Sequence, residues 1–326
     1  MPVLSFKKKR PAPATGASPQ RTNVRKLKRD GLTWYDFVNP TEADVRYLER
    51  NFDFHPLDYG DVRSTKQRPK LDTYDDYLFL IVHVPHFDKA SRRVVQEEVD
   101  IFIGQGYLVT LHSGRVKPLS NLFGEIERSQ PRRERYLTKG SGFLLYELVS
   151  RLFADGFPML DKIATRINAL ELKILKGNKA KDAAEELSYL KLEIINFRRI
   201  IRPQRALIRQ LEAVRKRFLP ARLDVYLDDV HDSLERMNDL LENYREVAQS
   251  LEDTNETFIQ HRTNNVVKVL TLVSLVTLPG ASISGLLAMN LRYPFPVDER
   301  LFFIAVGISV AFAVLLFSYM YFRRWL

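Results

Sequence analysis

The stretch that decides the fold reads VLTLVSLVTLPGASISGLLAM, and its residues 269–289 include no charged side chain. After a short polar segment a second uncharged run follows, LFFIAVGISVAFAVLLFSYMYF at residues 301–322. About 20 apolar residues in a helix span the hydrocarbon core of a bilayer. Two runs of this length are rare in a soluble core, so they predict a transmembrane hairpin. We expect a first membrane helix over residues 266–290, an outer loop over 291–300 and a second membrane helix over 301–322.

The first apolar run continues a helical pattern that begins much earlier in the chain. From Asp224 neither proline nor glycine occurs before Pro279, and the pattern extends to Met289. A helix of this length would be about 100 Å long, far more than a bilayer is thick. We therefore expect it to project into the cytosol as a stalk. Its apolar residues recur every three or four positions, which is typical of helices packed side by side. They are Val230, Leu234, Met237, Leu241, Tyr244, Ala248, Leu251 and Phe258.

Two more helices are expected before the stalk. One begins near residue 141 and is interrupted at Gly156-Phe157-Pro158, and the next has a kink at Pro203. Residues 198–217 hold eight Arg and Lys against one Glu, whereas residues 224–256 hold eleven acids against two Arg. We expect the basic helix and the acidic helix to pair. The helical domain and stalk together are assigned to residues 136–265.

The N-terminal part mixes strand and helix patterns. Residues 78–84, 99–103 and 107–112 are short, apolar and rich in β-branched residues, with a turn at residues 104–106. Thr41 is a good N-cap for a helix over residues 41–52. A further helix is expected at residues 119–129. These patterns predict a cytosolic α/β domain over residues 31–135.

The first 30 residues are strongly basic. They hold nine Lys and Arg against Asp30 alone, and so carry eight of the ten net positive charges of the chain. We expect residues 1–30 to be a disordered tail, because they have little apolar surface to bury. The tail either lies on anionic lipid headgroups or only keeps the chain soluble. Since the rest of the chain is nearly neutral, no nucleic-acid partner is expected.

Composition and motifs also bound the compartment and the function class. The chain has no cysteine, which excludes disulfides and thiolate metal sites. No secretory signal precedes the large domain, so we expect a multi-pass protein of the inner (cytoplasmic) membrane with both termini cytosolic, including residues 323–326. No phosphate-binding loop and no nucleophile–base signature is visible. An enzyme is therefore not expected, and neither is a cofactor.

Two helices cannot enclose a pore, so a channel of this kind needs several copies around an axis. The first membrane helix is better suited to line it, because residues such as Ser274, Ala281 and Gly285 let helices approach closely. The second membrane helix is bulky and aromatic, as a lipid-facing helix would be. A simple membrane anchor would need no such division between the two helices.

Asn290 lies at the outer end of the first membrane helix, where the helix carbonyls carry partial negative charge. A ring of amide oxygens there would accept hydrogen bonds from the waters of a hydrated ion. Magnesium keeps several of its waters, and a neutral ring would release the ion more readily than carboxylates would. A single Asn can also be an ordinary helix C-cap.

The segment KVLTLVSLVTLPGASISGLLAMN, followed by a second span and a basic C-terminus, resembles the CorA family of divalent-cation channels. The family motif is Gly-Met-Asn with a proline eleven residues before the Asn. Here Pro279, Met289 and Asn290 match, and Ala288 replaces the glycine. The resemblance covers nearly the whole chain. It implies a funnel-shaped homopentamer with an N-terminal cytosolic α/β domain, a long helical stalk and two C-terminal transmembrane helices.

The resemblance also implies roles for individual residues. Ala288, Met289 and Asn290 would form the selective pore mouth. An acidic ring near the cytosolic pore end would be Asp253. A regulatory ion site between neighbouring subunits would use Asp229, with Asp88 as a candidate partner on the adjacent α/β domain. The resemblance implies that the pore is lined by Val267, Leu270, Leu278 and Ala281. Ser274, a small residue of the same helix, is added to them because of its size.

The expected function is passive influx of a divalent cation, with magnesium as the first choice. Cobalt, nickel and zinc are alternatives, because Ala288 departs from the family motif. His83-x-x-His86 is a weak zinc pattern that straddles Pro85 near an expected strand end. A hypothesis of another class is a non-conducting scaffold derived from the channel, anchored among membrane lipids.

Overall fold

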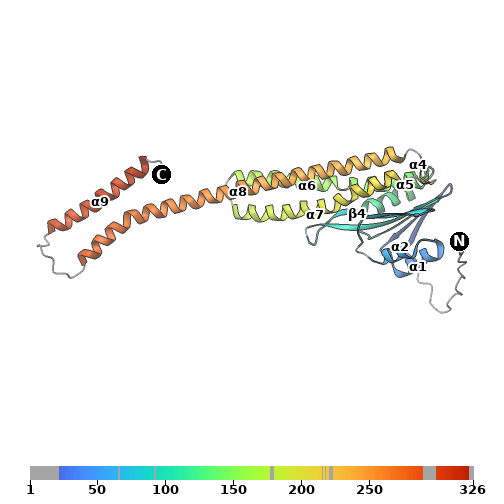
Figure 1. The fold of residues 1–326 in the computed structure, drawn as a ribbon, viewed down its shortest axis with the longest axis horizontal. Helices are drawn as coiled ribbons and strands as arrows, with labels where there is room; N and C mark the ends of the chain where they lie inside the picture. Colours follow the sequence, from blue (N-terminus) through green and yellow to red (C-terminus); the bar gives the residue numbers. More distant parts are fainter. Residues whose placement is uncertain are drawn as a thin grey trace, which may run out of the picture. The chain divides into compact units, whose positions relative to one another are not determined.

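The computed structural model describes residues 22–64, 67–91, 93–176, 180–214, 216, 218–219, 223–288 and 299–322. The chain divides into two compact units, one of residues 1–168 with 189–247 and the other of residues 169–188 with 248–326. The first unit contains an α/β domain with helices on both sides of its sheet (Figure 1). The helices over residues 157–175, 180–213 and 223–288 each have residues in both units. Each unit is described by itself below.

The α/β domain is built on a six-stranded sheet with the strand order β1-β2-β6-β5-β4-β3. The parallel pair is β2–β6, and the other neighbouring pairs are antiparallel. The strands are β1 (Val24–Arg29), β2 (Leu32–Val38), β3 (Lys70–Thr73), β4 (Tyr77–Asp88), β5 (Arg93–Gly104) and β6 (Tyr107–His112). The predicted turn at residues 104–106 joins β5 to β6. Gly106 has a φ of 78°, and a Cβ there would lie 2.7 Å from the carbonyl oxygen of Gly31.

The prediction of a disordered tail over residues 1–30 is wrong for its last part. Residues 24–29 form β1, which pairs with β2 through a turn at Asp30 and Gly31. Both turn residues have positive φ, as a two-residue hairpin requires. Leu27 is buried, whereas Lys26 and Lys28 on either side of it are exposed. Composition did not predict this strand, because Leu27 is its one buried apolar residue and the other residues are mostly basic.

The prediction that Pro85 lies at the end of a strand is also wrong. β4 continues to Asp88, and Pro85 is opposite Gln96 of β5. Positions three apart in a strand point to opposite faces of the sheet. His83 and His86 therefore do not converge, and His83 instead lies 3.4 Å from the Glu98 carboxylate.

Helices cover both faces of the sheet. On one face lie α1 (Glu42–Asn51), which the Thr41 N-cap begins as predicted, and α2 (Pro56–Arg63), which was not predicted. They enclose an apolar core with Phe79 and Phe102 of the sheet. The other face carries α3 (Lys117–Arg128), α4 (Gln130–Leu137) and α5 (Ser141–Ala154). There the rings of Trp34 and Phe123 meet edge to face at 5.1 Å.

A buried polar network ties β1, β2 and β6 together around Asp36. Its carboxylate accepts a hydrogen bond from Thr110 at 2.6 Å and is paired with Arg25 and with His112. Thr110 in turn accepts one from the Trp34 indole at 2.9 Å. Burial by itself would raise the pKa of Asp36, but His112, Thr110 and Arg25 hold the pKa of that carboxyl below its ordinary value.

Replacing Asp36 by Asn should therefore lower the free energy of unfolding of the α/β domain by about 3 kcal/mol at neutral pH, because Arg25 and His112 lose their buried counter-charge. The folded pKa lies below the unfolded one. The stabilisation by Asp36 is thus complete above the unfolded pKa of about 3.9 and is lost as pH falls through the folded pKa. Trp34 fluorescence in a Trp325→Phe background measures this unfolding locally. Asp30→Asn, the same change at an exposed site, should have little effect.

The helical part contains α6 (Phe157–Leu175), α7 (Ala180–Ala213), α8 (Leu223–Ala288) and α9 (Glu299–Phe322). The predicted interruption is present between α5 and α6, and Pro203 lies inside α7. The helix α8 has 66 residues, as its pattern predicted. In the first unit Val230, Leu234, Met237 and Leu241 of its apolar seam are buried. In the second unit Ala248 and Leu251 are buried, but Phe258 is 41% exposed, so the seam ends before Phe258 within one chain.

The predicted pairing of the basic and acidic helices is confirmed within the first unit. Arg198 of α7 lies 2.6 Å from Glu242 of α8, and Arg205 is paired with Glu235. Arg209 approaches the same Glu235 at 3.8 Å. The sorted charges therefore set which sides of α7 and α8 face each other.

Candidate functional site

The predicted pore-lining residues occupy one side of α8 in the second unit. Steps of three or four residues keep side chains on a common helix face. Val267, Leu270 and Leu278 are 54, 65 and 62% exposed, and Ala281 is also exposed. Ser274 is half-buried. An apolar stripe of this kind is unstable in water, and it therefore indicates a lipid environment or contact with other helices.

The hydroxyl groups of the same segment are satisfied within the helix. Thr271, Ser274 and Thr277 each donate a hydrogen bond to the carbonyl four residues earlier, at 2.8, 2.9 and 2.8 Å. Polar groups that are satisfied within their own helix add little cost in a bilayer. Pro279 lies in this helix and has no backbone N–H, so the carbonyl four residues earlier lacks its helical hydrogen bond and can accept one from a neighbouring group. The segment therefore has the properties of a membrane helix.

Among the described residues, α8 alone is both long and apolar enough to cross a membrane, and none of its most apolar window is buried. In α9 a shorter apolar stretch, Val306–Tyr319, is found. Phe303, Ile308 and Leu315 of α9 are exposed. The second membrane crossing stays a prediction.

The predicted pore mouth is described only in part. Ala288 is the last residue of α8, and Met289 and Asn290 lie outside the described residues. Their arrangement around an ion therefore stays a prediction.

The structure describes the other predicted ion-binding residues separately. Asp253 is exposed in the second unit and accepts a hydrogen bond from Gln249 at 3.1 Å. Asp229 is exposed in the first unit, and burial together with the charge of Asp229 raises the pKa of Tyr146.

Asp88 is the last residue of β4 and is followed by the turn to β5. It accepts hydrogen bonds from the backbone N–H groups of Ala90 and Ser91 and from the Ser91 hydroxyl at 2.7 Å. These bonds hold the pKa of Asp88 below its ordinary value. Within the described part of one chain Asp88 and Asp229 share no contact, and a site that uses both would need two chains.

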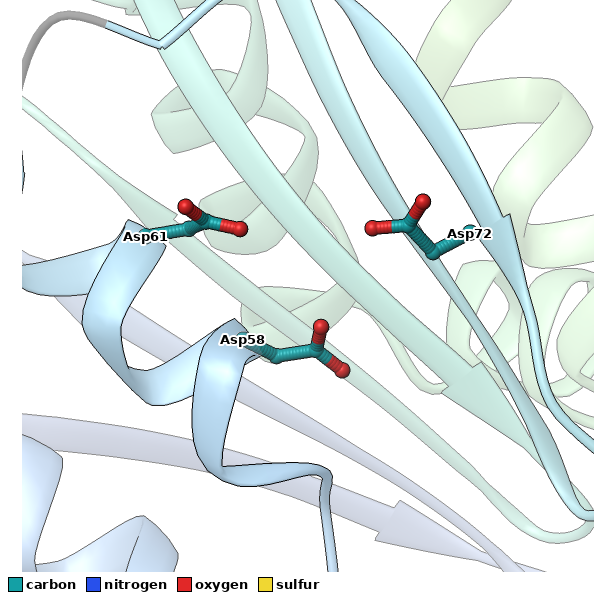
Figure 2. A group of neighbouring side chains, drawn as sticks. All are labelled: Asp58, Asp61 and Asp72. Atoms are coloured by element: carbon teal, nitrogen blue, oxygen red, sulfur yellow. The ribbon is translucent and has the colours of Figure 1, made fainter.

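Sequence reasoning missed an acidic cluster on the α/β domain. Asp58 and Asp61 of α2 and Asp72 of β3 point toward one another (Figure 2), and their oxygen atoms lie within 4.8 Å. The spacing of Asp58 and Asp61 puts both on one side of a helix. That was the available signal, but β3 and its register were not predictable from residues 70–73 alone.

The cluster is tied to its surroundings by charged hydrogen bonds. Lys70 donates to Asp61 at 2.6 Å and to Asp72 at 2.5 Å. Tyr74 and Tyr77 donate to the two oxygens of Asp58 at 2.8 and 2.6 Å. Burial raises the pKa of Asp58, and burial together with Asp58 raises the pKa of Tyr74 to about 12. The pKa of Lys70 is raised by both aspartates against the opposing effect of burial.

An α/β domain followed by a helical bundle and a long helix with an apolar end defines a class of membrane protein. The description CorA-like Mg²⁺ transporter protein belongs to a family model that matches residues 29–324. The chain therefore belongs to this family, whose members are membrane transporters and not enzymes. The family assignment made from the C-terminal motif is confirmed.

Individual relatives agree with this assignment. YfjQ of Bacillus subtilis is 26% identical over 93% of both chains. The cobalt/magnesium transport protein CorA of Thermotoga maritima is 25% identical over 90% of this chain and 83% of its own length. The solved structure of the CorA magnesium transporter of Methanocaldococcus jannaschii matches with a TM-score of 0.77 at 21% identity, covering 91% of this chain and 92% of that one. This match confirms the fold of an N-terminal α/β domain plus a long helix.

Proposed function

We propose that the protein is a homopentameric channel of the cytoplasmic membrane that conducts a divalent cation, with magnesium as its main ion, passively inward. Each copy contributes two membrane helices, α8 and α9, and keeps its α/β domain and both termini in the cytosol. Five copies of α8 surround the pore, and five copies of α9 face the lipid.

The observation that carries this proposal is the exposed stripe on α8. Exposure of Val267, Leu270 and Leu278 to water is unfavourable. Full removal of each side chain from water would contribute about 1.5–3 kcal/mol of free energy. The second observation is chemical. Ser274, Gly280 and Ala281 are small, and small residues allow close approach of helix backbones in a membrane. Bulky residues dominate α9, where no close approach is needed.

The ion would be selected at the ring of five Asn290 side chains. Their amide oxygens accept hydrogen bonds from the waters that magnesium retains, so the ion need not be dehydrated at the mouth. The membrane potential then drives it inward, by about 4.6 kcal/mol per 100 mV for two charges. A neutral ring binds the ion weakly enough for it to leave, as conduction requires.

The gate would be the apolar constriction formed by Leu270 and Leu278, which closes when water leaves it. Asp253 would concentrate cations at the cytosolic end. Cytosolic metal bound by Asp229, with Asp88 of a neighbouring copy as a partner, would hold the acidic stalks together and keep the pore closed. Loss of that metal would let the like charges repel and loosen the pentamer.

Flux into liposomes tests this function. Purified protein in liposomes should carry Mg²⁺ down its gradient, faster with an inside-negative potential and more slowly with metal on the cytosolic side. A panel of Mg²⁺, Co²⁺, Ni²⁺ and Zn²⁺ determines the ion, and a preference for cobalt, nickel or zinc would replace magnesium within the same mechanism. The T. maritima relative is named for cobalt and magnesium transport, which makes these two the first to compare. Absence of flux for every cation would favour the non-conducting scaffold.

A further inference from the structure

A cavity of about 370 Å³ lies on the helices of the first unit, and we call it the arginine cavity. Its apolar lining consists of Ile194, Ile195 and Pro203 of α7. The rest of its lining is arginine, namely Arg198, Arg199 and Arg202 of α7 and Arg245 of α8. The volume is within the range of about 300–1,000 Å³ that is typical of sites for small molecules. The cavity therefore combines an apolar surface with several guanidinium groups.

The helical repeat of α7 brings these side chains together. Ile195, Arg199 and Arg202 follow one another at steps of four and three residues, which keeps them on one side of the helix. Arg199 and Arg202 are exposed, and Ile195 is 43% exposed. A ligand that covers this side of α7 would thus contact apolar and positively charged groups at once.

The arginine cavity carries an excess of positive charge. Glu242 of α8 contacts both Arg198 and Arg245 at 2.6 Å, so one carboxylate serves two guanidinium groups. Within the part of the chain that the structure describes, Arg199 and Arg202 form no ion pair. Four arginines less one glutamate leave three positive charges at the cavity. The pairing of α7 with α8 therefore does not account for Arg199 and Arg202.

Phosphate groups are the anions that fit such a group of arginines. A planar guanidinium donates two parallel hydrogen bonds to phosphate oxygens, and its charge does not depend on pH in the physiological range. A terminal phosphate carries about two negative charges at neutral pH, so a diphosphate balances the excess better than a carboxylate does. The apolar lining beside the arginines suits a flat, apolar ring that is attached to the phosphates.

We propose that the arginine cavity binds a nucleotide. Its phosphates lie on Arg199 and Arg202, with Arg198 and Arg245 beside them, and its base packs on Ile195. The nucleotide brings the negative charge that the ion pairs between α7 and α8 do not supply. This site is separate from the proposed pore and from the proposed regulatory metal site, and it does not depend on conduction.

Calorimetric titration with ADP tests the proposal on the full-length protein in detergent. A chelator is present, so that no metal ion links ADP to acidic residues elsewhere. The double variant Arg199→Gln/Arg202→Gln should bind ADP at least about tenfold more weakly, because two charged hydrogen-bond donors are lost. Pyrophosphate, which lacks the base, should bind the wild type at least about tenfold more weakly than ADP does.

Ile195→Ser tests the apolar part of the site separately. It should weaken the binding of ADP about fivefold and leave the binding of pyrophosphate unchanged, because only the base packs on this side chain. The matched control is Arg50→Gln/Arg128→Gln, which removes the same two charges from exposed positions on α1 and α3. This control should bind ADP as the wild type does. Circular dichroism reports whether each variant keeps its helices.

Equal affinity for ADP in the wild type and in a folded Arg199→Gln/Arg202→Gln variant would overturn the proposal. An equal loss in the control variant would also overturn it, because attraction by net charge would then explain the binding. Equal affinities for ADP and pyrophosphate would exclude a nucleotide. Absence of ADP binding together with a changed oligomeric state of the double variant would assign the cavity to an acidic surface of a second copy instead. If the double variant loses its helices, Ile195→Ser decides.

Discussion

Replacing Asn290 by Ala is expected to reduce divalent-cation flux at least about hundredfold while the pentamer still assembles. The methyl group cannot accept hydrogen bonds from the waters of the ion, and the mouth would present an apolar ring to a strongly hydrated cation. Flux in liposomes measures the loss, and the oligomeric state of the detergent-solubilised protein measures assembly.

The matched control is Asn265→Ala. Asn265 is exposed on α8, and the helical repeat puts it on the side opposite Val267. The same amide is removed there without touching the proposed pathway, so flux should be retained. Asn290→Asp tests whether the ring must be neutral, since a carboxylate ring should bind the ion more tightly and pass it more slowly. Undiminished flux in Asn290→Ala would refute the selective ring, and loss of assembly would make the residue structural.

Replacing Asp229 by Lys is expected to abolish the inhibition of flux by cytosolic metal. Residues 224–256 carry eleven acids against two Arg, and Arg198 and Arg205 of α7 pair with two of these acids. In the proposed pentamer, metal would offset the repulsion that remains between neighbouring stalks. A lysine both removes a ligand and supplies positive charge at the same place. The measurement is flux against the concentration of metal on the cytosolic side, where the wild type should fall steeply and the variant should stay level.

Asp239→Lys is the control for this second prediction. Asp239 is also exposed on α8 and undergoes the same charge change, but it lies ten residues away, about 15 Å along the helix. At physiological salt the Debye length is about 8 Å, so the change at Asp239 is largely screened from Asp229. Retained metal inhibition in Asp229→Lys, or equal loss in both variants, would remove Asp229 from the regulatory site.

The two experiments answer different questions. Asn290→Ala tests conduction, and Asp229→Lys tests the control of that conduction by cytosolic metal.

The amino-acid sequence by itself determined the long helix and its apolar end. Helix α8 and its buried seam follow from spacings of three and four residues, which are local and repeat along the chain. The pairing of α7 with α8 was predictable as well, because basic residues are concentrated in one of these segments and acidic residues in the other. The family was also recognisable, because Pro279, Met289 and Asn290 are close together in one segment.

Only the tertiary structure decided which residues meet across the sheet. β1 has a single fully buried apolar residue, Leu27, and β3 is four residues long, so neither strand has a pattern of its own. Their places depend on pairing with β2 and β4, which is a long-range choice. The acidic cluster depends on the same choice, since the register of β3 against β4 brings Asp72 to α2. Contacts across the sheet are set by packing and strand register, and a local sequence pattern does not contain them.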